Sequence, residues 1–381
     1  MPWQEITIVS SRKEFVMLAS KEGANISELC SRFGISRTTG YKWLKRSDRD
    51  DAASLENRSR RPKSSPGQTS GDLEAAVIAV RREHPRWGGR KIRAVLLRRN
   101  IENAPAASTI TGILARHGMI DPAESAARKP FIRFEHEAPN RLWQIDFKGH
   151  FALSETTARC HPLTVVDDHS RFALEIGACA NEQTATVRER LSGAFRRYGL
   201  PERMTMDNGA PWGSSGETDH GLTPLTVWLI RLGIKISHSR PFHPQTQGKN
   251  ERFNGTLKME ILRDHSWRDL VQAQNGFDRW RDIYNLERPH EAIGMKVPAD
   301  RYCASQRTFP ETLPTIEYPA GSTVRQVRPR GFVKYKGRLL RVPRALHGHP
   351  VAIENTATDG LYDIKLLHQK ITQLDLREKV P

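Results

Sequence analysis

Apolar residues in the first 130 positions recur with helical spacing and predict two groups of three helices. Residues 11–46 contain a helix-turn-helix pattern, in which Gly34 closes one helix and Ser36 caps the next. The second group is predicted at 72–83, through 99 after a turn at 85–92, and over 108–117 with Ser108 as its cap. The last helix of the first group would lie in a major groove through an exposed face formed by Arg37, Thr38, Thr39 and Lys42.

Between about 137 and 305, apolar runs of strand length alternate with helical patterns, which predicts an α/β domain. Residues 142–147 form a predicted buried strand with an acid, Asp146, in its middle. Residues 163–176 suggest a hairpin, 184–198 a helix, and 203–207 a short strand that closes on an Asn-Gly turn. Helical patterns return from 225, from 248 and from 266.

The chain beyond 310 changes to short strand patterns. Residues 332–342 and 351–364 are hairpin-like runs that turn at Lys-Gly and Asp-Gly, so residues 321–381 are predicted to form a small basic β-barrel. Its first hairpin carries Lys334, Lys336 and Arg338, which would contact the DNA backbone. The alternative is an appendix that serves folding or dimerisation.

Charge is distributed unevenly along the 381 residues. The net charge is +17, yet the segment 131–320 is neutral and both flanks are basic. This distribution is expected when the flanks hold a polyanion while the centre acts on it. Residues 57–71 are predicted to be a basic linker, and their Arg60 and Arg61 leave open whether it also lies in a minor groove.

Two further compositional features narrow the class of protein. The four cysteines show no CxxC spacing, which favours a reducing cytosol and no zinc site. No apolar run approaches the ~18 residues of a membrane span, so we expect a cytoplasmic protein without a membrane partner.

Three acidic residues stand out as candidate ligands of a metal ion. Glu251 falls in the first turn of a predicted helix whose buried stripe is Phe253, Leu257 and Ile261, and whose other face carries Glu251, Gly255 and Lys258. Asp146 lies within a buried strand, and Asp207 stands at a strand's carboxyl end, where open α/β sheets build their sites. Carboxylates from these elements suit Mg²⁺. An isolated Glu251 would instead merely favour the helix dipole.

Asp167 and Asp168 compete with Asp146 for the first of these places. Their Asp-Asp-His-Ser setting is typical of a turn in which the side chain bonds the nearby backbone. We therefore expect structural roles for both.

The residues around the three acids resemble a known family. Trp-Gln-Ile-Asp at 143–146, Met-Asp-Asn-Gly at 206–209 and His-Pro-Gln-Thr-Gln-Gly-Lys-Asn-Glu-Arg-Phe-Asn at 243–254 are similar to the DDE blocks of the retroviral-integrase superfamily, in its bacterial insertion-sequence branch. The resemblance implies an RNase H-like core at 131–310 with Asp146, Asp207 and Glu251 as the catalytic and metal-binding triad. It also implies two Mg²⁺ ions, with Mn²⁺ as a substitute, and phosphate contacts by Lys249 and Lys258.

Similarity extends to the flanks of this core. Pro-Arg-Trp-Gly-Gly-Arg-Lys-Ile at 85–92, with Arg90 and Lys91, resembles a second helix-turn-helix before the core, so residues 1–56 and 72–130 would both bind DNA. The implied protein is a bacterial, nucleoid-associated transposase. Its expected partners are double-stranded transposon ends, target DNA and further copies of itself, as a dimer or larger assembly.

Two other functions would use the same residues. An RNase H-like nuclease would cut DNA without joining it, and a DNA-binding regulator would have lost activity. The glycine-rich residues 210–221 form either a lid or DNA-gripping loop that uses Trp212, or a tolerated insertion. Arg288 and His290, in an Asn-x-x-Arg-Pro-His motif, are either phosphate neighbours or packing residues.

Overall fold

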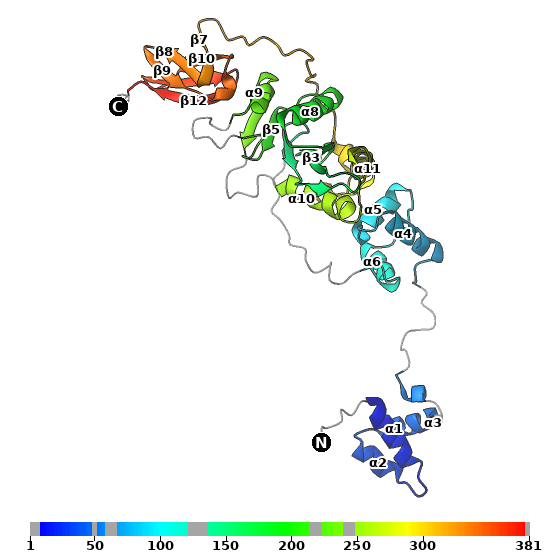
Figure 1. Cartoon of the computed structure of the whole chain (residues 1–381). Coiled ribbons are helices and arrows are strands. Elements are labelled where there is room, and N and C mark those ends of the chain that lie inside the picture. Colours follow the sequence, from blue (N-terminus) through cyan, green and yellow to red (C-terminus); the bar gives the residue numbers. More distant parts are fainter. Residues whose placement is uncertain are drawn as a thin grey trace. The chain divides into compact units, whose positions relative to one another are not determined.

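The computed structural model describes residues 8–47, 52–57, 67–120, 136–213, 222–238 and 248–377 (Figure 1). The chain forms two compact units, Met1–Gln68 and Thr69–Pro381. The predicted linker is largely outside the described residues, as are its Arg60 and Arg61. Among the helices that the structure describes, none combines the length and the apolar character needed to cross a membrane.

The first unit is the predicted helix-turn-helix. Its helices are α1 (Ile8–Ala19), α2 (Ile26–Arg32) and α3 (Arg37–Arg46). The turn works as expected: Gly34 takes a φ of +61°, and the Ser36 side chain accepts a hydrogen bond from the Thr39 N–H at 3.2 Å. Gly40 lets α2 and α3 approach closely, because a Cβ there would lie 2.5 Å from the Cys30 Sγ.

A second helical group opens the larger unit. It contains α4 (Gly71–Glu83), α5 (Gly89–Arg98) and α6 (Ala107–Arg116), packed around the buried Trp87. The predicted helices are confirmed, but the predicted cap is wrong. The helix starts one residue before Ser108, with Ala106 at the N-cap and no side chain bonded there.

The centre of the larger unit is a mixed six-stranded sheet. Its strands are β1 (Trp143–Phe147), β2 (Phe151–Ala152), β3 (Arg159–Asp167), β4 (Ala173–Cys179), β5 (Arg203–Met206) and β6 (Lys235–His238). They follow the order β2-β3-β1-β5-β6, and β4 also pairs with β3. The strands β1, β5 and β6 are parallel to one another, and β1 is antiparallel to β3. This is the α/β core that the sequence predicts.

Helices cover both faces of this sheet. They are α8 (Thr184–Tyr198), α9 (Pro224–Arg231), α10 (Gly248–Leu257) and α11 (Leu270–Asp282). Figure 1 shows α8 on one side of the sheet and α10 on the other. Trp143 and Ile145 of β1 pack into one apolar core with residues of α8 and α9, whereas a second core contains residues of α10 and α11. Because side chains alternate along a strand, Gln144 and Asp146 face the α10 side.

The described C-terminal strands form a four-stranded antiparallel sheet and a separate hairpin, and their ladders do not close into the predicted barrel. The strands are β7 (Thr323–Gln326), β8 (Phe332–Tyr335), β9 (Arg338–Arg341), β10 (Pro350–Asn355), β11 (Leu361–Leu366) and β12 (Gln369–Asp375). Four of them follow the order β12-β11-β10-β7, while β8 and β9 pair with each other as a separate hairpin. Closure would need a ladder between the edges of the sheet, and the described ladders instead leave β7 and β12 at opposite edges.

Candidate active site

Strand register brings two of the predicted acids together. The parallel strands β1 and β5 pair Trp143 with Met204 and Gln144 with Thr205. Continuing this register by two residues sets Asp146 level with Asp207, which directly follows β5. Residues at matching positions of neighbouring strands point to the same face. Asp146 and Asp207 therefore lie side by side on the face that α10 covers.

Asp146 carries its charge in an unfavourable environment. Burial raises the pKa of its carboxyl to about 6, and the negative charges of Asp207 and Glu251 contribute to this rise. A backbone hydrogen bond from Phe147 and the charge of Lys148 oppose it. The Asn254 Nδ2 donates to the Asp146 Oδ2 at 2.9 Å. These groups orient the carboxylate without cancelling the effect of burial and like charge.

Asp207 is less enclosed and belongs to a turn. The Gly209 N–H donates to its Oδ1 at 3.1 Å, as expected for an Asn-Gly turn at the end of a strand. Burial nevertheless raises the pKa of the Asp207 carboxyl. The His238 Nδ1 lies 2.8 Å from the Asp207 backbone oxygen and links the ends of β5 and β6.

The third acid comes from α10. Glu251 lies in the first turn of this helix and is exposed. The predicted stripe is confirmed, because Phe253, Leu257 and Ile261 are buried while Gly255 and Lys258 are exposed with Glu251. Residues 239–247, the first half of the motif that precedes Glu251, lie outside the described part of the chain.

The donor set fits a hard divalent cation held partly by its substrate. Within the residues that the structure describes, no three His, Cys, Asp or Glu side chains come close enough to form a metal cage. Mg²⁺ is normally held by one or two carboxylates together with water and substrate phosphates, so a closed cage is not required. A cation beside Asp146 and Asp207 would also relieve the like charges that raise the Asp146 pKa.

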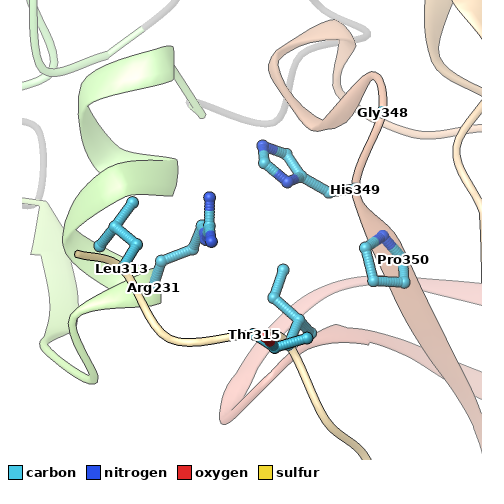
Figure 2. Close-up of a pocket in the computed structure, with 7 residues that line it drawn as sticks. Arg231, Leu313, Thr315, Gly348, His349 and Pro350 are labelled. Atoms are coloured by element: carbon cyan, nitrogen blue, oxygen red, sulfur yellow. The ribbon is translucent and has the colours of Figure 1, made fainter.

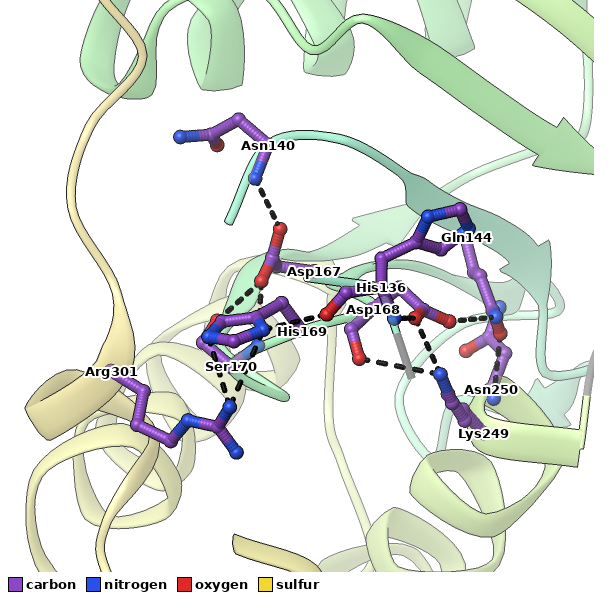
Figure 3. Close-up of polar contacts among 10 residues, drawn as sticks. All are labelled: His136, Asn140, Gln144, Asp167, Asp168, His169, Ser170, Lys249, Asn250 and Arg301. Atoms are coloured by element: carbon purple, nitrogen blue, oxygen red, sulfur yellow. Dashed lines mark hydrogen bonds and ion pairs between the residues drawn. The ribbon is translucent and has the colours of Figure 1, made fainter. Parts of the chain in front are cut away.

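Asp167 is different in kind from this pair. Its Oδ2 accepts from the Asn140 N–H at 2.7 Å, and its Oδ1 accepts from the N–H and Oγ of Ser170 at 2.8 and 2.6 Å (Figure 3). The carboxylate is fully buried, and burial raises its pKa although these donors lower it. The structural role predicted for Asp167 is confirmed by these bonds, which close the turn between β3 and β4.

Asp168 joins the turn to the helix that carries Glu251. The Gln144 Nε2 donates to its Oδ1 at 2.9 Å, and the Lys249 Nζ donates to its Oδ2 at 2.5 Å. The same Oδ2 accepts from the His136 N–H at 3.0 Å. Gln144 is not among the predicted site residues, although its position two residues before Asp146 puts it on the same face of the strand. Binding of a DNA phosphate by Lys249 stays a prediction. In this structure its ammonium forms an ion pair with the Asp168 carboxylate.

The residues predicted to contact DNA in the helical groups are mostly at the surface. Arg37, Thr38 and Lys42 are exposed on α3, whereas the Thr39 hydroxyl lies 2.9 Å from the Ser36 Oγ within the cap. In the second group Arg90 is exposed and forms an ion pair with Glu291 at 3.4 Å. Its neighbour Lys91 is half-buried. Their contacts with DNA stay predictions.

Two of the three basic residues predicted in the C-terminal hairpin have partners within the chain. Lys334 is exposed on β8. The Lys336 Nζ donates to the Tyr362 hydroxyl at 2.5 Å and lies over that ring. Arg338 donates to the backbone oxygens of Asp375 and Leu376. Arg338 therefore helps to fix the C-terminal sheet, and its DNA contact stays a prediction.

Trp212 corrects one expectation about the loop after Asp207. Its side chain is only 1% exposed and packs in the core of the sheet, with its ring centroid 5.8 Å from that of Phe147. A residue that fills the core cannot grip DNA, so this use of Trp212 is wrong. Residues 214–221 of the loop lie outside the described residues.

The Asn-x-x-Arg-Pro-His motif favours packing over phosphate binding. The Arg288 Nε donates to the Glu260 Oε1 at 3.0 Å, and both side chains are about nine-tenths buried. Asn285 bonds the backbone N–H and oxygen of Ala173, tying this segment to β4. Burial lowers the pKa of His290 well below its usual value.

A separate pocket lies between α9 and the C-terminal sheet. Figure 2 shows it, with a volume of about 410 Å³ and a lining that includes Arg231, Leu313, Thr315, His349 and Pro350. None of the three candidate acids lines it. It is therefore not part of the carboxylate site.

Models of known protein families match most of the chain. The matches are to a Helix-turn-helix domain (residues 12–63), a Homeodomain-like domain (39–114), the Integrase core domain in two models (136–244 and 232–298) and the IS481 family transposase, C-terminal domain (322–381). The chain belongs to the insertion-sequence transposases with an integrase core. This family implies DNA transposition, and the helix-turn-helix matches indicate DNA binding.

The individual proteins that are similar to this chain include proteins of insertion elements and a retroviral integrase core. The transposase is 26% identical over 292 residues to an uncharacterized 31.7 kDa protein of insertion element IS407 from Burkholderia multivorans, covering 74% of this chain and 93% of that protein. It is 30% identical over 170 residues to an uncharacterized 39.2 kDa protein of IS476 from Xanthomonas euvesicatoria, covering 45% and 46%. A solved HTLV-2 integrase catalytic core in complex with magnesium is similar to 43% of this transposase over 97% of its own chain, with 16% identity and a TM-score of 0.32.

Proposed function

We propose that this transposase binds the terminal inverted repeats of its insertion sequence, cleaves their 3′ ends and joins them to target DNA. The proposal rests on the register of the parallel strands β1 and β5, which aligns Asp146 with Asp207 when it is continued by two residues, and on Glu251 in the first turn of α10. The raised pKa values of Asp146 and Asp207 support it, because carboxylates with perturbed pKa values are typical of functional sites.

Asp146, Asp207 and Glu251 would hold two Mg²⁺ ions, which Mn²⁺ could replace. Such ions, when bound, would activate the attacking oxygen at neutral pH and stabilise the leaving 3′ oxygen. The protein's own contribution is to fix the carboxylates. The Asn254 amide orients Asp146, and the Gly209 N–H orients Asp207.

One site serves both cleavage and joining. Both reactions are in-line displacements at phosphorus, with water as the nucleophile in the first and the freed 3′-OH in the second. Neither needs a covalent intermediate with the enzyme. Lys258, which is exposed as Glu251 is, would neutralise a phosphate of the bound strand.

The flanking domains would hold the DNA. The exposed face of α3 would offer Arg37 and Lys42 to a major groove, and the hairpin of β8 and β9 would add the exposed Lys334. Pairing two transposon ends requires at least two active sites, so we propose a dimer or larger assembly on DNA.

The test uses purified full-length transposase, Mg²⁺ and a labelled duplex that carries one end of the insertion sequence, taken from the DNA flanking its coding region. Cleavage at the 3′ end and joining to a plasmid are followed on gels. We expect both products from the wild type and neither from Asp207→Asn. The control is Asp278→Asn, the same chemical change at a half-exposed side chain of α11, which should retain both activities.

The alternatives give different results in the same assay. Cleavage by the wild type without joining would support an RNase H-like nuclease. Tight binding with neither product would support a DNA-binding regulator. Full activity of Asp207→Asn would remove Asp207 from the site.

A further inference from the structure

We propose that Asp168 is a positioning residue, which fixes the first turn of α10 through Lys249 and Gln144 and thereby sets the position of Glu251. Neither Asp168 nor Gln144 belongs to the proposed triad. The inference deepens the proposed function and rests on it for one of its two tests. We call this group of residues the clamp; it consists of Gln144, Asp168, Lys249 and Asn250.

The clamp joins elements that are distant in sequence. Asp168 follows β3 and is only 2% exposed, Gln144 is on β1 and equally buried, and Lys249 and Asn250 are in the first turn of α10. Figure 3 shows the Asp168 carboxylate between the Gln144 amide and the Lys249 ammonium. One carboxylate therefore holds a strand and a helix together from the turn between β3 and β4.

Gln144 serves as a cap for α10 that comes from another element. The first N–H groups of a helix have no partner within it and need an outside acceptor. The Gln144 Oε1 accepts from the Asn250 N–H at 3.1 Å, and the other end of the same amide donates to Asp168 at 2.9 Å. Because Asp168 can only accept, it forces the Gln144 amide to present its oxygen to the helix.

The ion pair adds a second connection to the same turn. A buried carboxylate is costly unless a cation and hydrogen bonds compensate it. Lys249 supplies that cation from 2.5 Å, and its side chain is largely buried. The backbone of the turn is thus tied down at two successive residues, by the Lys249 side chain and by the Asn250 N–H.

Glu251 depends on this backbone for its position. It is the next residue after Asn250, and its own side chain is exposed. A loosened first turn would leave Phe253 and Leu257 packed while Glu251 moved relative to Asp146 and Asp207. The clamp therefore acts on the geometry of the site rather than on the stability of the core.

The first test measures amide hydrogen exchange in the full-length protein without DNA or metal. Asp168→Asn removes the anion but keeps the size of the side chain. We expect amides at the start of α10 to exchange about tenfold faster or more, since a charge-assisted contact and a capping contact are weakened together. Peptides from β3, β4 and α8 should keep their wild-type rates.

The matched control is Glu175→Gln. Glu175 is 4% exposed, but its cationic partner is Arg190 of α8 at 3.8 Å. This variant should leave exchange at the start of α10 unchanged. The proposal would be overturned if amide exchange in the first turn of α10 became faster to the same extent in both variants. It would also be overturned if exchange there did not change in Asp168→Asn.

The second test uses the labelled transposon end with Mg²⁺ or Mn²⁺. Mg²⁺ demands near-ideal octahedral geometry, so a displaced Glu251 should affect it more strongly. We expect Asp168→Asn to lower the cleavage rate in Mg²⁺ about tenfold or more, with a smaller loss in Mn²⁺ and an unchanged apparent affinity for DNA. Equal losses with both metals would contradict a positioning role.

Variants of Lys249 complete the design. Lys249→Arg should keep the ion pair and most of the activity, whereas Lys249→Met leaves a buried anion and can fail to fold. In that event the double variant Asp168→Asn/Lys249→Met, which removes both charges, shows the same fast exchange at the start of α10. A slow, wild-type rate there would overturn the proposal. If the wild type cleaves no DNA, the proposed function fails, while the exchange experiment still decides the clamp.

Discussion

Two pairs of carboxylates belong to the same sheet region but are stabilised differently: Asp167 and Asp168 at the turn after β3, and Asp146 in β1 with Asp207 after β5. Asp167 accepts three hydrogen bonds from Asn140 and Ser170, and Asp168 accepts from three groups that include the Lys249 ammonium. Asp146 accepts from the Asn254 amide and the Phe147 N–H, and the charges of Asp207 and Glu251 disfavour its ionised form. Burial raises the pKa of both Asp146 and Asp167, but Asp167 has three donors, which reach both of its oxygens.

The difference separates a structural acid from one available to a ligand. A buried carboxylate whose two oxygens already accept hydrogen bonds from the protein is less available to a metal ion and is expensive to remove. One that lacks donors and lies beside like charges stores unfavourable energy that a cation can release. Neighbouring acids in the sequence can therefore have opposite roles.

The largest expected effect is the loss of catalytic activity in the variant Asp146→Asn. Removing a metal-binding carboxylate should lower the rate of 3′-end cleavage about a thousandfold or more, ~4 kcal/mol in the barrier. Single-turnover cleavage with saturating protein measures it, and circular dichroism shows that the fold is kept. A loss of cleavage rate below about tenfold would contradict the distinction between the ligand-binding acids Asp146 and Asp207 and the structural acids Asp167 and Asp168.

Asp167→Asn should instead act on folding. The substituted amide would direct N–H donors at the N–H groups of Asn140 or Ser170, in a site that is fully buried. We expect the free energy of unfolding to fall by about 2–4 kcal/mol. Urea denaturation monitored by tryptophan fluorescence is the measurement, and a change under 0.5 kcal/mol would contradict the structural role.

Asp146→Asn should make the metal-free protein more stable at neutral pH. The raised pKa means that folded Asp146 binds its proton more tightly than the unfolded chain does. Wild-type stability relative to the variant is therefore greatest below pH ~4 and is lost as the pH rises through about 6. The gain above pH 6 is at most about 3 kcal/mol.

Denaturant unfolding of wild type and Asp146→Asn in chelator, from pH 4 to pH 8, measures this difference. The two proteins should converge at the acidic end. A gain that is independent of pH would show that the Asp146 carboxyl does not carry the effect. Added Mg²⁺ should then stabilise the wild type more than the variant.

The smallest effect is expected at an exposed carboxylate. Glu202 pairs with Arg141 at 2.6 Å, and both side chains are about half exposed. Glu202→Gln should change neither the denaturation midpoint nor cleavage measurably, because solvent and salt screen such pairs. A large change in the midpoint or in the cleavage rate would mean that the number of hydrogen bonds does not distinguish structural carboxylates from those available to a ligand.

The sequence by itself determined the local features of this protein. Helical periodicity located Phe253, Leu257 and Ile261 on one side of α10 and Glu251 on the other, and turn residues such as Gly34 and Ser36 fixed the helix-turn-helix. These features depend on residues a few positions apart, whose relative placement follows from the repeat of a helix or strand. The candidate acids Asp146, Asp207 and Glu251 were found in the same way, from short motifs at the ends or in the middle of such elements.

Only the tertiary structure decided which partners these residues meet. Trp212 fills the core instead of facing DNA, Lys249 lies on an acid 81 residues away, and Gln144 caps a helix 106 residues away. The open C-terminal sheet likewise depended on which strand edges pair. Such contacts arise from packing between elements that local periodicity does not place relative to one another, and a lysine or a tryptophan has the same local pattern whether a carboxylate, a core or a phosphate lies opposite.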